Sequence, residues 1–66
     1  MSVAKIIEIN AESEKSFEDA IDKGIKQAST TVRGIKGAWV KGQQVLVNDD
    51  KVTTYRVDLK VTFILD

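Results

Sequence analysis

Hydrophobic positions along the chain change from one periodicity to another, and these periodicities predict its elements. Residues 4–10, Ala-Lys-Ile-Ile-Glu-Ile-Asn, form a short isoleucine-rich run typical of a strand with one side more buried than the other. Further on, apolar or small side chains recur at helical spacing, at Phe17, Ala20, Ile21, Gly24, Ile25, Ala28 and Val32. The residues between these positions from 18 to 31 are all polar, so the pattern predicts an amphipathic helix.

Signals at the two ends of this pattern predict where the helix begins and ends. Ser13 stands where an N-cap belongs, with Glu14 in the first turn and Ser16 three residues later. Arg33 followed by Gly34 predicts the C-terminal end. A glycine within the apolar stripe of a helix costs about 1 kcal/mol relative to alanine, so the glycine in this stripe predicts close packing of a strand there.

The last third of the chain alternates strictly between two sides. One side holds Tyr55, Val57, Leu59, Val61, Phe63 and Leu65, and the other holds Thr54, Arg56, Asp58, Lys60, Thr62 and Ile64. The preceding run at 48–51, Asn-Asp-Asp-Lys, predicts a turn between antiparallel strands. We therefore predict an α+β fold in the order β-α-β-β, a three-stranded antiparallel sheet packed on one face by a single helix. At roughly 3.3 Å per residue the last strand exceeds about 40 Å, so we expect it to bend or to reach a neighbouring subunit.

The single helix of this fold leaves the other face of the sheet uncovered. On the middle strand, Ala38 and Val40 suit the side that meets the helix. The uncovered face is then predicted to present a candidate ligand surface made of Gly37, Trp39, Lys41, Gln43, Arg56 and Asp58. A one-residue β-bulge at Gly42 would reverse this phase.

Three interpretations remain open for the tryptophan, the only one in the chain. Trp39 packs into a subunit interface, helped by the aliphatic stems of Lys41, Lys60 or Arg56. Alternatively it is a stacking platform for a planar ligand, with Arg56 and the glutamines as polar partners. In the third interpretation it caps the end of the core under the crossover loop.

Length and composition favour a single domain, residues 1–66, that depends on self-association. A chain of this size buries only about 60% of the surface that its unfolded form exposes. It contains no cysteine and no histidine, which excludes disulfides and thiolate or imidazole metal sites. Oligomerisation is the stabilising device that remains.

Charge and functional-group content exclude several classes of protein. Ten basic and ten acidic residues cancel and are interspersed, so we expect no nucleic-acid partner and no membrane partner. The apolar residues before Glu8 are too few for the core of a signal peptide or for a membrane span, which predicts a cytoplasmic protein. Without histidine, thiol or a glycine-rich phosphate loop, we predict that the protein is not an enzyme.

The charged residues offer candidates for metal and anion sites. The run at 48–50, Asn-Asp-Asp, lacks the ligand spacing of an EF-hand, so no metal site is predicted within one chain. Symmetry-related carboxylates remain candidates, from Glu12, Glu14, Asp58 and Asp66. For Arg56 an intersubunit ion-pair ladder is favoured. The alternative is an anion site shared with Lys41 or Lys60.

Three segments in this order resemble one protein family. They are Ser-Glu-Lys-Ser-Phe-Glu-Asp-Ala at 13–20, Ala-Trp-Val at 38–40 and Tyr-Arg-Val-Asp-Leu-Lys-Val-Thr-Phe-Ile-Leu at 55–65. Together they resemble the dodecins. The resemblance implies a hollow homododecamer built from trimers, with helices outside and strands inside, that binds and stores flavins.

At two functional positions the chain departs from the family pattern. The resemblance implies a flavin-stacking tryptophan on the middle strand and a glutamine on the last strand that hydrogen-bonds the ring edge. Those positions hold Gly37 and Arg56, and Trp39 lies two residues further along, on the same side and displaced by about 6.6 Å. We therefore expect weak or altered binding of FMN or riboflavin. The alternative is a structural, metal-binding or anion-binding assembly that binds no flavin.

Overall fold

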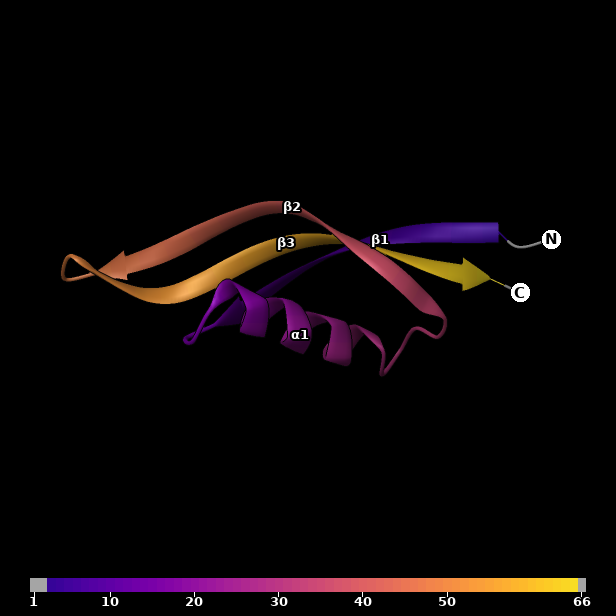
Figure 1. Cartoon of the computed structure of the whole chain (residues 1–66), viewed down its shortest axis with the longest axis horizontal. Helices are drawn as coiled ribbons and strands as arrows, with labels where there is room; N and C mark the ends of the chain where they lie inside the picture. Colours follow the sequence, from indigo (N-terminus) through magenta and orange to yellow (C-terminus); the bar gives the residue numbers. More distant parts are fainter. Residues whose placement is uncertain (1–2, 66) are drawn as a thin grey trace.

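The computed structural model describes residues 3–65, which form one helix on one face of a three-stranded sheet (Figure 1). The elements are β1 (Val3–Ser13), α1 (Phe17–Ala28), β2 (Ile35–Asn48) and β3 (Lys51–Leu65). The strand order is β1-β3-β2, and both pairings are antiparallel. The predicted fold class and element order are confirmed.

The alternation of the last strand builds the core. Because β3 is the central strand, its inward side chains are covered by α1 and flanked by both neighbouring strands. The buried hydrophobic side chains are Ala20, Ala28, Val57, Leu59, Val61 and Phe63. The intervening β3 side chains are only partly buried and face away from the helix. The alternation of β3 therefore determines which of its side chains lie on the face of the sheet opposite α1.

A close approach of α1 to β1 explains the glycine in the apolar stripe. A Cβ atom added to Gly24 would lie 2.9 Å from the Cβ of Ala11 and 3.4 Å from Cδ1 of Leu59. Real Cβ atoms essentially never lie within 3.0 Å of a neighbour, so the contact with Ala11 leaves no room for a side chain at position 24. The predicted packing of a strand against this position is confirmed.

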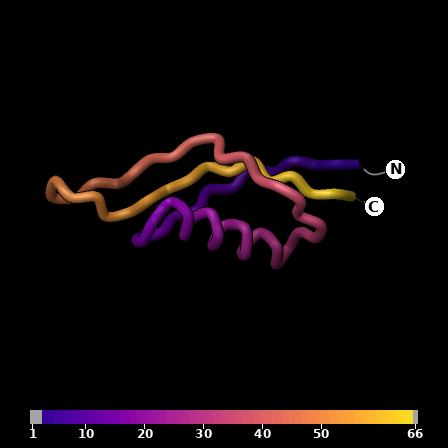
Figure 2. The backbone as a smooth tube through the Cα atoms, viewed as in Figure 1, coloured from indigo at the N-terminus to yellow at the C-terminus, as the bar shows by residue number. Residues whose placement is uncertain are grey.

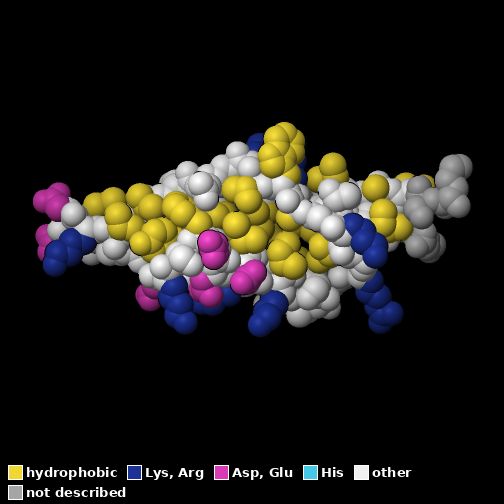
Figure 3. Space-filling view, viewed as in Figure 1, with side chains coloured by type: hydrophobic (Ala, Val, Ile, Leu, Met, Phe, Trp, Pro, Cys, Tyr) yellow, Lys and Arg dark blue, Asp and Glu magenta, His cyan; other side chains and the backbone are white. Residues whose placement is uncertain are grey.

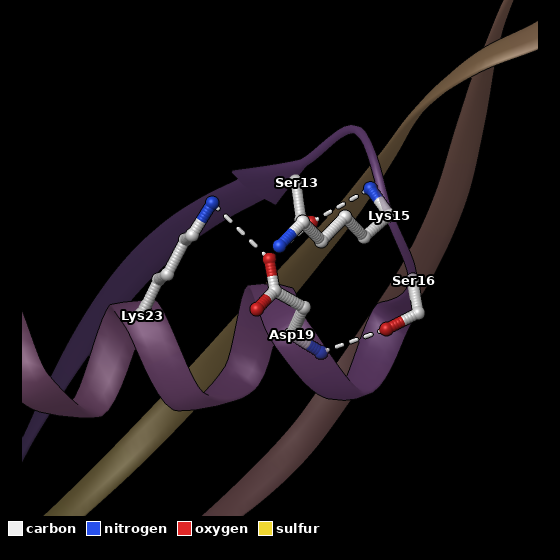
Figure 4. Close-up of polar contacts among 5 residues, drawn as sticks. All are labelled: Ser13, Lys15, Ser16, Asp19 and Lys23. Atoms are coloured by element: carbon white, nitrogen blue, oxygen red, sulfur yellow. Dashed lines mark hydrogen bonds and ion pairs between the residues drawn. The ribbon is translucent and has the colours of Figure 1, made fainter.

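Ser16, rather than Ser13, caps the N-terminus of α1 (Figure 4). The Ser16 hydroxyl accepts the backbone N–H of Asp19 at 3.0 Å. Ser13 is the last residue of β1, where it pairs with Tyr55, so the strand continues three residues beyond the predicted end. The prediction that Ser13 is the N-cap was wrong because both serines have the right chemistry and only the ladder pairing separates them.

The buried hydroxyl of Ser13 has a different role, since it joins β1 to the first turn of α1. It donates to Oδ2 of Asp19 at 2.6 Å and accepts the N–H of Lys15 at 2.9 Å (Figure 4). Lys23 lies 3.1 Å from the same carboxylate oxygen. The hydrogen bond from Ser13, and then that from Lys23, lower the pKa of Asp19 from its ordinary value of 3.8.

The helix ends at Ala28, about one turn before the predicted Arg33-Gly34 signal. The hydroxyls of Ser29 and Thr30 donate to the carbonyls of Lys26 and Gln27, both at 2.7 Å. Such local side-chain bonds to the backbone compete with continuation of a helix. Gly34, with φ of 75°, instead lies in the loop that leads to β2.

The β2–β3 hairpin extends well past the helix, as both ribbon and tube show (Figures 1 and 2). Asp49 and Asp50 have φ of 57° and 63°, the two left-handed positions of a type I′ turn, which confirms the predicted turn. The molecule measures 52 × 19 × 14 Å. Its radius of gyration is 13.5 Å, against about 11 Å for a compact domain of this length.

Residues 45–54, here called the hairpin arm, carry hydrophobic side chains that the helix does not cover. Figure 3 shows a band of hydrophobic side chains along this part of the molecule. Val47 is 60% exposed and Val52 is 50% exposed, and they are partners in the ladder. One chain alone leaves this apolar surface in water.

Candidate ligand-binding site

The candidate site lies on the helix-free face, defined as the side of the sheet opposite α1. Trp39 is the ladder partner of Lys60, whose neighbours Leu59 and Val61 are buried on the helix side. Trp39 is therefore directed away from the helix, and it is 68% exposed. The interpretation of Trp39 as a cap on the core is wrong, because the core lies between the sheet and α1 and the indole is on the opposite side of the sheet.

A β-bulge at Lys41 changes the phase of the middle strand. Val40 pairs with Leu59 and Gly42 with Asp58, so Lys41 is the additional residue. After the bulge, Gln43 is the partner of Val57, which is buried on the helix side. The prediction that Gln43 shares the face of Trp39 was wrong, because an extra residue exchanges the two sides of a strand.

Gln44 takes the place that was predicted for Gln43. It is the ladder partner of Arg56 and therefore lies on the helix-free face. Because Gln43 and Gln44 are adjacent, the sequence places a glutamine on the helix-free face whichever way the strand is turned. The position of the bulge decides between them, and Lys41 itself still reaches the helix-free face.

Cross-strand pairs from β1 engage several polar side chains of this face. Nζ of Lys41 lies 3.2 Å from Oε1 of Glu8, and Nε of Arg56 donates to Oε2 of Glu12 at 2.6 Å. Both carboxylates come from the same chain, whereas the sequence favoured partners from other subunits for Arg56. These groups are largely exposed, so each pair contributes only about 0 to 1 kcal/mol to stability.

Asp58 lies between these two ion pairs and has an amide partner. The side-chain amide of Asn10 donates to Oδ1 of Asp58, and the two residues are partners in the β1–β3 ladder. The other oxygen, Oδ2, lies toward Gly42, 3.5 Å from where a Cβ of residue 42 would be. Within residues 3–65, no hydrogen bond engages Oδ2.

Sequence analysis missed Glu8 and Asn10 as members of this face, and it placed Gln43 there in the position that Gln44 occupies. The first two alternate with Ile7, Ile9 and Ala11, all packed against the core. This alternation in residues 7–12 was the available signal. The signal was weak because residues 3–7, Val-Ala-Lys-Ile-Ile, do not alternate between apolar and polar side chains.

Lys60 is placed against the indole. Its Nζ lies 5.5 Å from the centroid of the Trp39 ring, within the range of a cation–π contact. Among residues 3–65 no carboxylate lies within ion-pair distance of this ammonium group, in contrast to Lys41 and Arg56. A positive charge without a carboxylate partner therefore adjoins the exposed aromatic ring.

Space beside the tryptophan is open at Gly37. A Cβ added there would meet no atom within 4 Å. Gly37 pairs with Thr62, which places it on the same face as Trp39. The position to which the resemblance assigns a stacking tryptophan is thus unobstructed in the single chain.

The acidic side chains of the described part of the chain are dispersed. Residues 3–65 contain no group of three or more acidic, histidine or cysteine side chains arranged to hold a metal ion. Glu12, Glu14 and Asp58 are therefore not gathered into one site within a chain, and Asp66 lies outside the described residues. The described helix is too short and too polar to cross a bilayer.

Comparison with known proteins identifies the family. The family model described as Dodecin matches residues 3–66. The chain belongs to the dodecin family. Among curated dodecins, the calcium dodecin of Mycobacterium tuberculosis is 36% identical over 63 residues, which cover 96% of this chain and 89% of the relative.

Solved dodecin structures have the same fold over nearly the whole chain. The dodecin from Streptomyces davaonensis superposes with a TM-score of 0.94 at 28% identity, covering 98% of this chain and 96% of that one. An arginine-to-alanine mutant of T. thermophilus dodecin gives 0.94 at 30% identity, with coverage of 100% and 98%. The M. tuberculosis calcium dodecin, described as having a novel calcium-binding site, gives 0.84 at 33% identity, with coverage of 97% and 91%.

Proposed function

We propose that this dodecin is a homo-oligomeric binding and storage protein whose helix-free face holds a planar ligand such as FMN or riboflavin. The observation that carries the proposal is the exposed indole of Trp39 on that face. An aromatic ring beside a few polar groups is what small-molecule sites commonly contain. The role is binding rather than catalysis, in a cytoplasmic protein.

Self-association is the second part of the proposal. The chain is longer and thinner than a compact domain, and Val3, Ile6, Val47 and Val52 are each at least half exposed. Sister chains that covered these surfaces would add the burial that 66 residues lack. A homododecamer built from trimers is the assembly that we expect.

Flavin affinity is expected to be weaker than in a dodecin with the standard stacking and ring-edge residues. Gly37 offers no ring, and Arg56 only donates hydrogen bonds and is already paired with Glu12. Loss of one stacking contact weakens binding by roughly 1 to 3 kcal/mol. Trp39, displaced along the strand, compensates in part.

One titration tests the proposal. Trp39 is the only tryptophan, so its fluorescence reports directly on this face. We expect FMN and riboflavin to quench it saturably, and we expect Trp39→Ala protein to leave flavin fluorescence unquenched. Light scattering on the same sample measures the assembly. Absence of quenching by both flavins would refute the ligand assignment, and a monomer would refute the assembly.

A calcium-binding assembly is the second candidate, favoured by the similarity to the M. tuberculosis calcium dodecin. A site of this kind requires carboxylates from several chains, for example copies of Asp58 around a symmetry axis, because residues 3–65 of one chain hold no such group. Calorimetric titration with Ca²⁺ distinguishes the candidates. Saturable heat with Ca²⁺ and no quenching by flavin would favour this alternative.

A further inference from the structure

We propose that Lys60 and Asp58 form the polar edge of the Trp39 site and select a planar heterocycle that presents a hydrogen-bond acceptor beside an N–H donor. This inference rests on the proposed function, because it takes Trp39 to be the stacking surface. It assigns the ligand contacts to residues other than Gly37 and Arg56, where the family pattern has changed. The ligand class follows from the hydrogen-bonding partner that each side chain lacks, an acceptor for Lys60 and a donor for Asp58.

Lys60 supplies the donor side of this edge. Its ammonium group lies 5.5 Å from the indole centroid and has no carboxylate partner among residues 3–65. A lysine ammonium has three N–H donors and no acceptor, so it requires an acceptor or an anionic group. A ligand ring that stacks on this face of the indole displaces the ammonium group from above it, and the flexible lysine stem lets the ammonium group meet the edge atoms of the ligand. A carbonyl oxygen or a deprotonated ring nitrogen satisfies the requirement.

Asp58 supplies the acceptor side. It precedes Lys60 by two residues on β3, so the two side chains leave the same face about 6.6 Å apart along the strand. Asn10 engages Oδ1, while no donor among residues 3–65 engages Oδ2. The absence of a side chain at Gly42 leaves Oδ2 accessible. An ionised carboxylate only accepts, so it requires an N–H or O–H donor from the ligand.

The other charged groups of the face are already engaged. Lys41 is paired with Glu8, and Arg56 is paired with Glu12. Beside the indole, the groups of residues 3–65 without an ion-pair or hydrogen-bond partner include the Lys60 ammonium group, Oδ2 of Asp58 and Oε2 of Glu8, the ladder partner of Lys60. The flexible stem of Lys60 allows its ammonium group and Oδ2 of Asp58 to reach neighbouring atoms on the edge of one ring. An imide edge, with an N–H between two carbonyl groups, has the matching pattern.

Lumiflavin and N3-methyllumiflavin test this pattern because they differ only in the imide N–H. We expect wild-type protein to bind lumiflavin about tenfold more tightly than the methylated analogue, as for loss of a hydrogen bond to a charged group. Asp58→Ala should weaken lumiflavin binding by a similar factor and abolish the discrimination between the analogues. Lys60→Met should weaken binding of both analogues. Lys26→Met and Asp22→Ala, which alter an exposed lysine and an exposed aspartate of α1 outside the site, serve as matched controls.

Two results would separate failure of this inference from failure of the proposed function. Equal affinity of wild-type protein for both analogues, with binding abolished in Trp39→Ala, would overturn the role of Asp58 and Lys60 while retaining the flavin site. No binding of either analogue to wild-type protein would overturn both. The comparison of analogues uses unmodified protein, so it decides the question even if a variant fails to assemble.

Discussion

Ala11 of β1 and Gly24 of α1 lie so close that a Cβ atom on the glycine would be 2.9 Å from the alanine Cβ. This contact fixes how closely the helix approaches the edge strand. Leu59 and Ile9 complete the surroundings, with their Cδ1 atoms at 3.4 and 3.5 Å from the same point. At Gly24 the backbone of the helix therefore lies directly against the methyl group of Ala11.

Gly24→Ala should destabilise the protein even though alanine is the better helix former. The gain in helix propensity is about 1 kcal/mol. Overpacking against Ala11 costs about 1 to 3 kcal/mol, so we expect a net loss of about 1 kcal/mol in the free energy of unfolding. Gly37→Ala is the control, because its Cβ meets nothing within 4 Å. Urea denaturation should show a loss for the first variant only, and equal stability of both would contradict this account.

Replacement of Asp50 by glycine should stabilise the hairpin. Asp50 has φ of 63°, a conformation that costs a residue with a Cβ atom about 1 kcal/mol or more. Glycine adopts it freely but loses more entropy on folding, so we expect a net gain of about 0.5 kcal/mol. Asp50→Ala should have the opposite sign. Thermal unfolding of the two variants measures the difference, and a lower Tm for the glycine variant would show that the turn has another conformation.

Acid should weaken the contact between β1 and α1 through Asp19. The pKa of this carboxyl group is lowered in the folded protein, chiefly by the hydrogen bond from Ser13. The stabilisation is present above the ordinary value of 3.8 and is lost as the pH falls through the lower folded pKa. In Ser13→Ala the pKa of Asp19 should rise toward its ordinary value. Carboxyl NMR titration measures this shift, and an unchanged pKa would refute the role of Ser13.

Polar substitutions in the hairpin arm should dissociate the assembly without unfolding the chain. Val47 and Val52 are mostly exposed in a single chain, so Val47→Ser with Val52→Ser removes few contacts of the monomer. Light scattering should show smaller species, while circular dichroism retains the β signal. The control is Lys26→Ser, at an exposed position of α1 that lies outside the arm and outside the other surfaces proposed to meet sister chains. An intact oligomer in the double variant would exclude the arm as a main interface.

Restoring the family residues should increase flavin affinity. Gly37→Trp places a ring where the single chain has open space, and Arg56→Gln restores an acceptor. We expect FMN binding to tighten by roughly tenfold to a hundredfold, the value of one aromatic stacking contact. Fluorescence titration of each single variant and of the double variant measures the separate contributions. Unchanged affinity in the double variant would refute the residue correspondence.

The strict alternation in residues 54–65 predicted the buried side of β3, and with the helical spacing before it this predicted the fold. From Val57 to Phe63 one side of β3 is buried under α1, and the other side is the helix-free face, as the sequence indicated, whereas Leu65 on the predicted inward side is 46% exposed. The turn before it was equally clear from its composition. These features are local, since period and turn chemistry are visible within a few residues.

The errors arose where the answer depends on residues distant in the sequence. Whether Ser13 caps the helix depends on its pairing with Tyr55, and whether Gln43 faces the helix depends on the bulge at Lys41. Similarly, Glu12 engages Arg56 across 44 positions of sequence. No local pattern in either segment specifies such a pairing.

The central position of β3 has a consequence for synthesis of the protein on the ribosome. Both edge strands hydrogen-bond only to β3, which is made last of the three. While the first 50 residues emerge, β1 and β2 have no partner strand, and only α1 is present to cover part of their isoleucine and valine side chains. The nascent chain must therefore be kept from aggregating until residues 51–65 leave the exit tunnel.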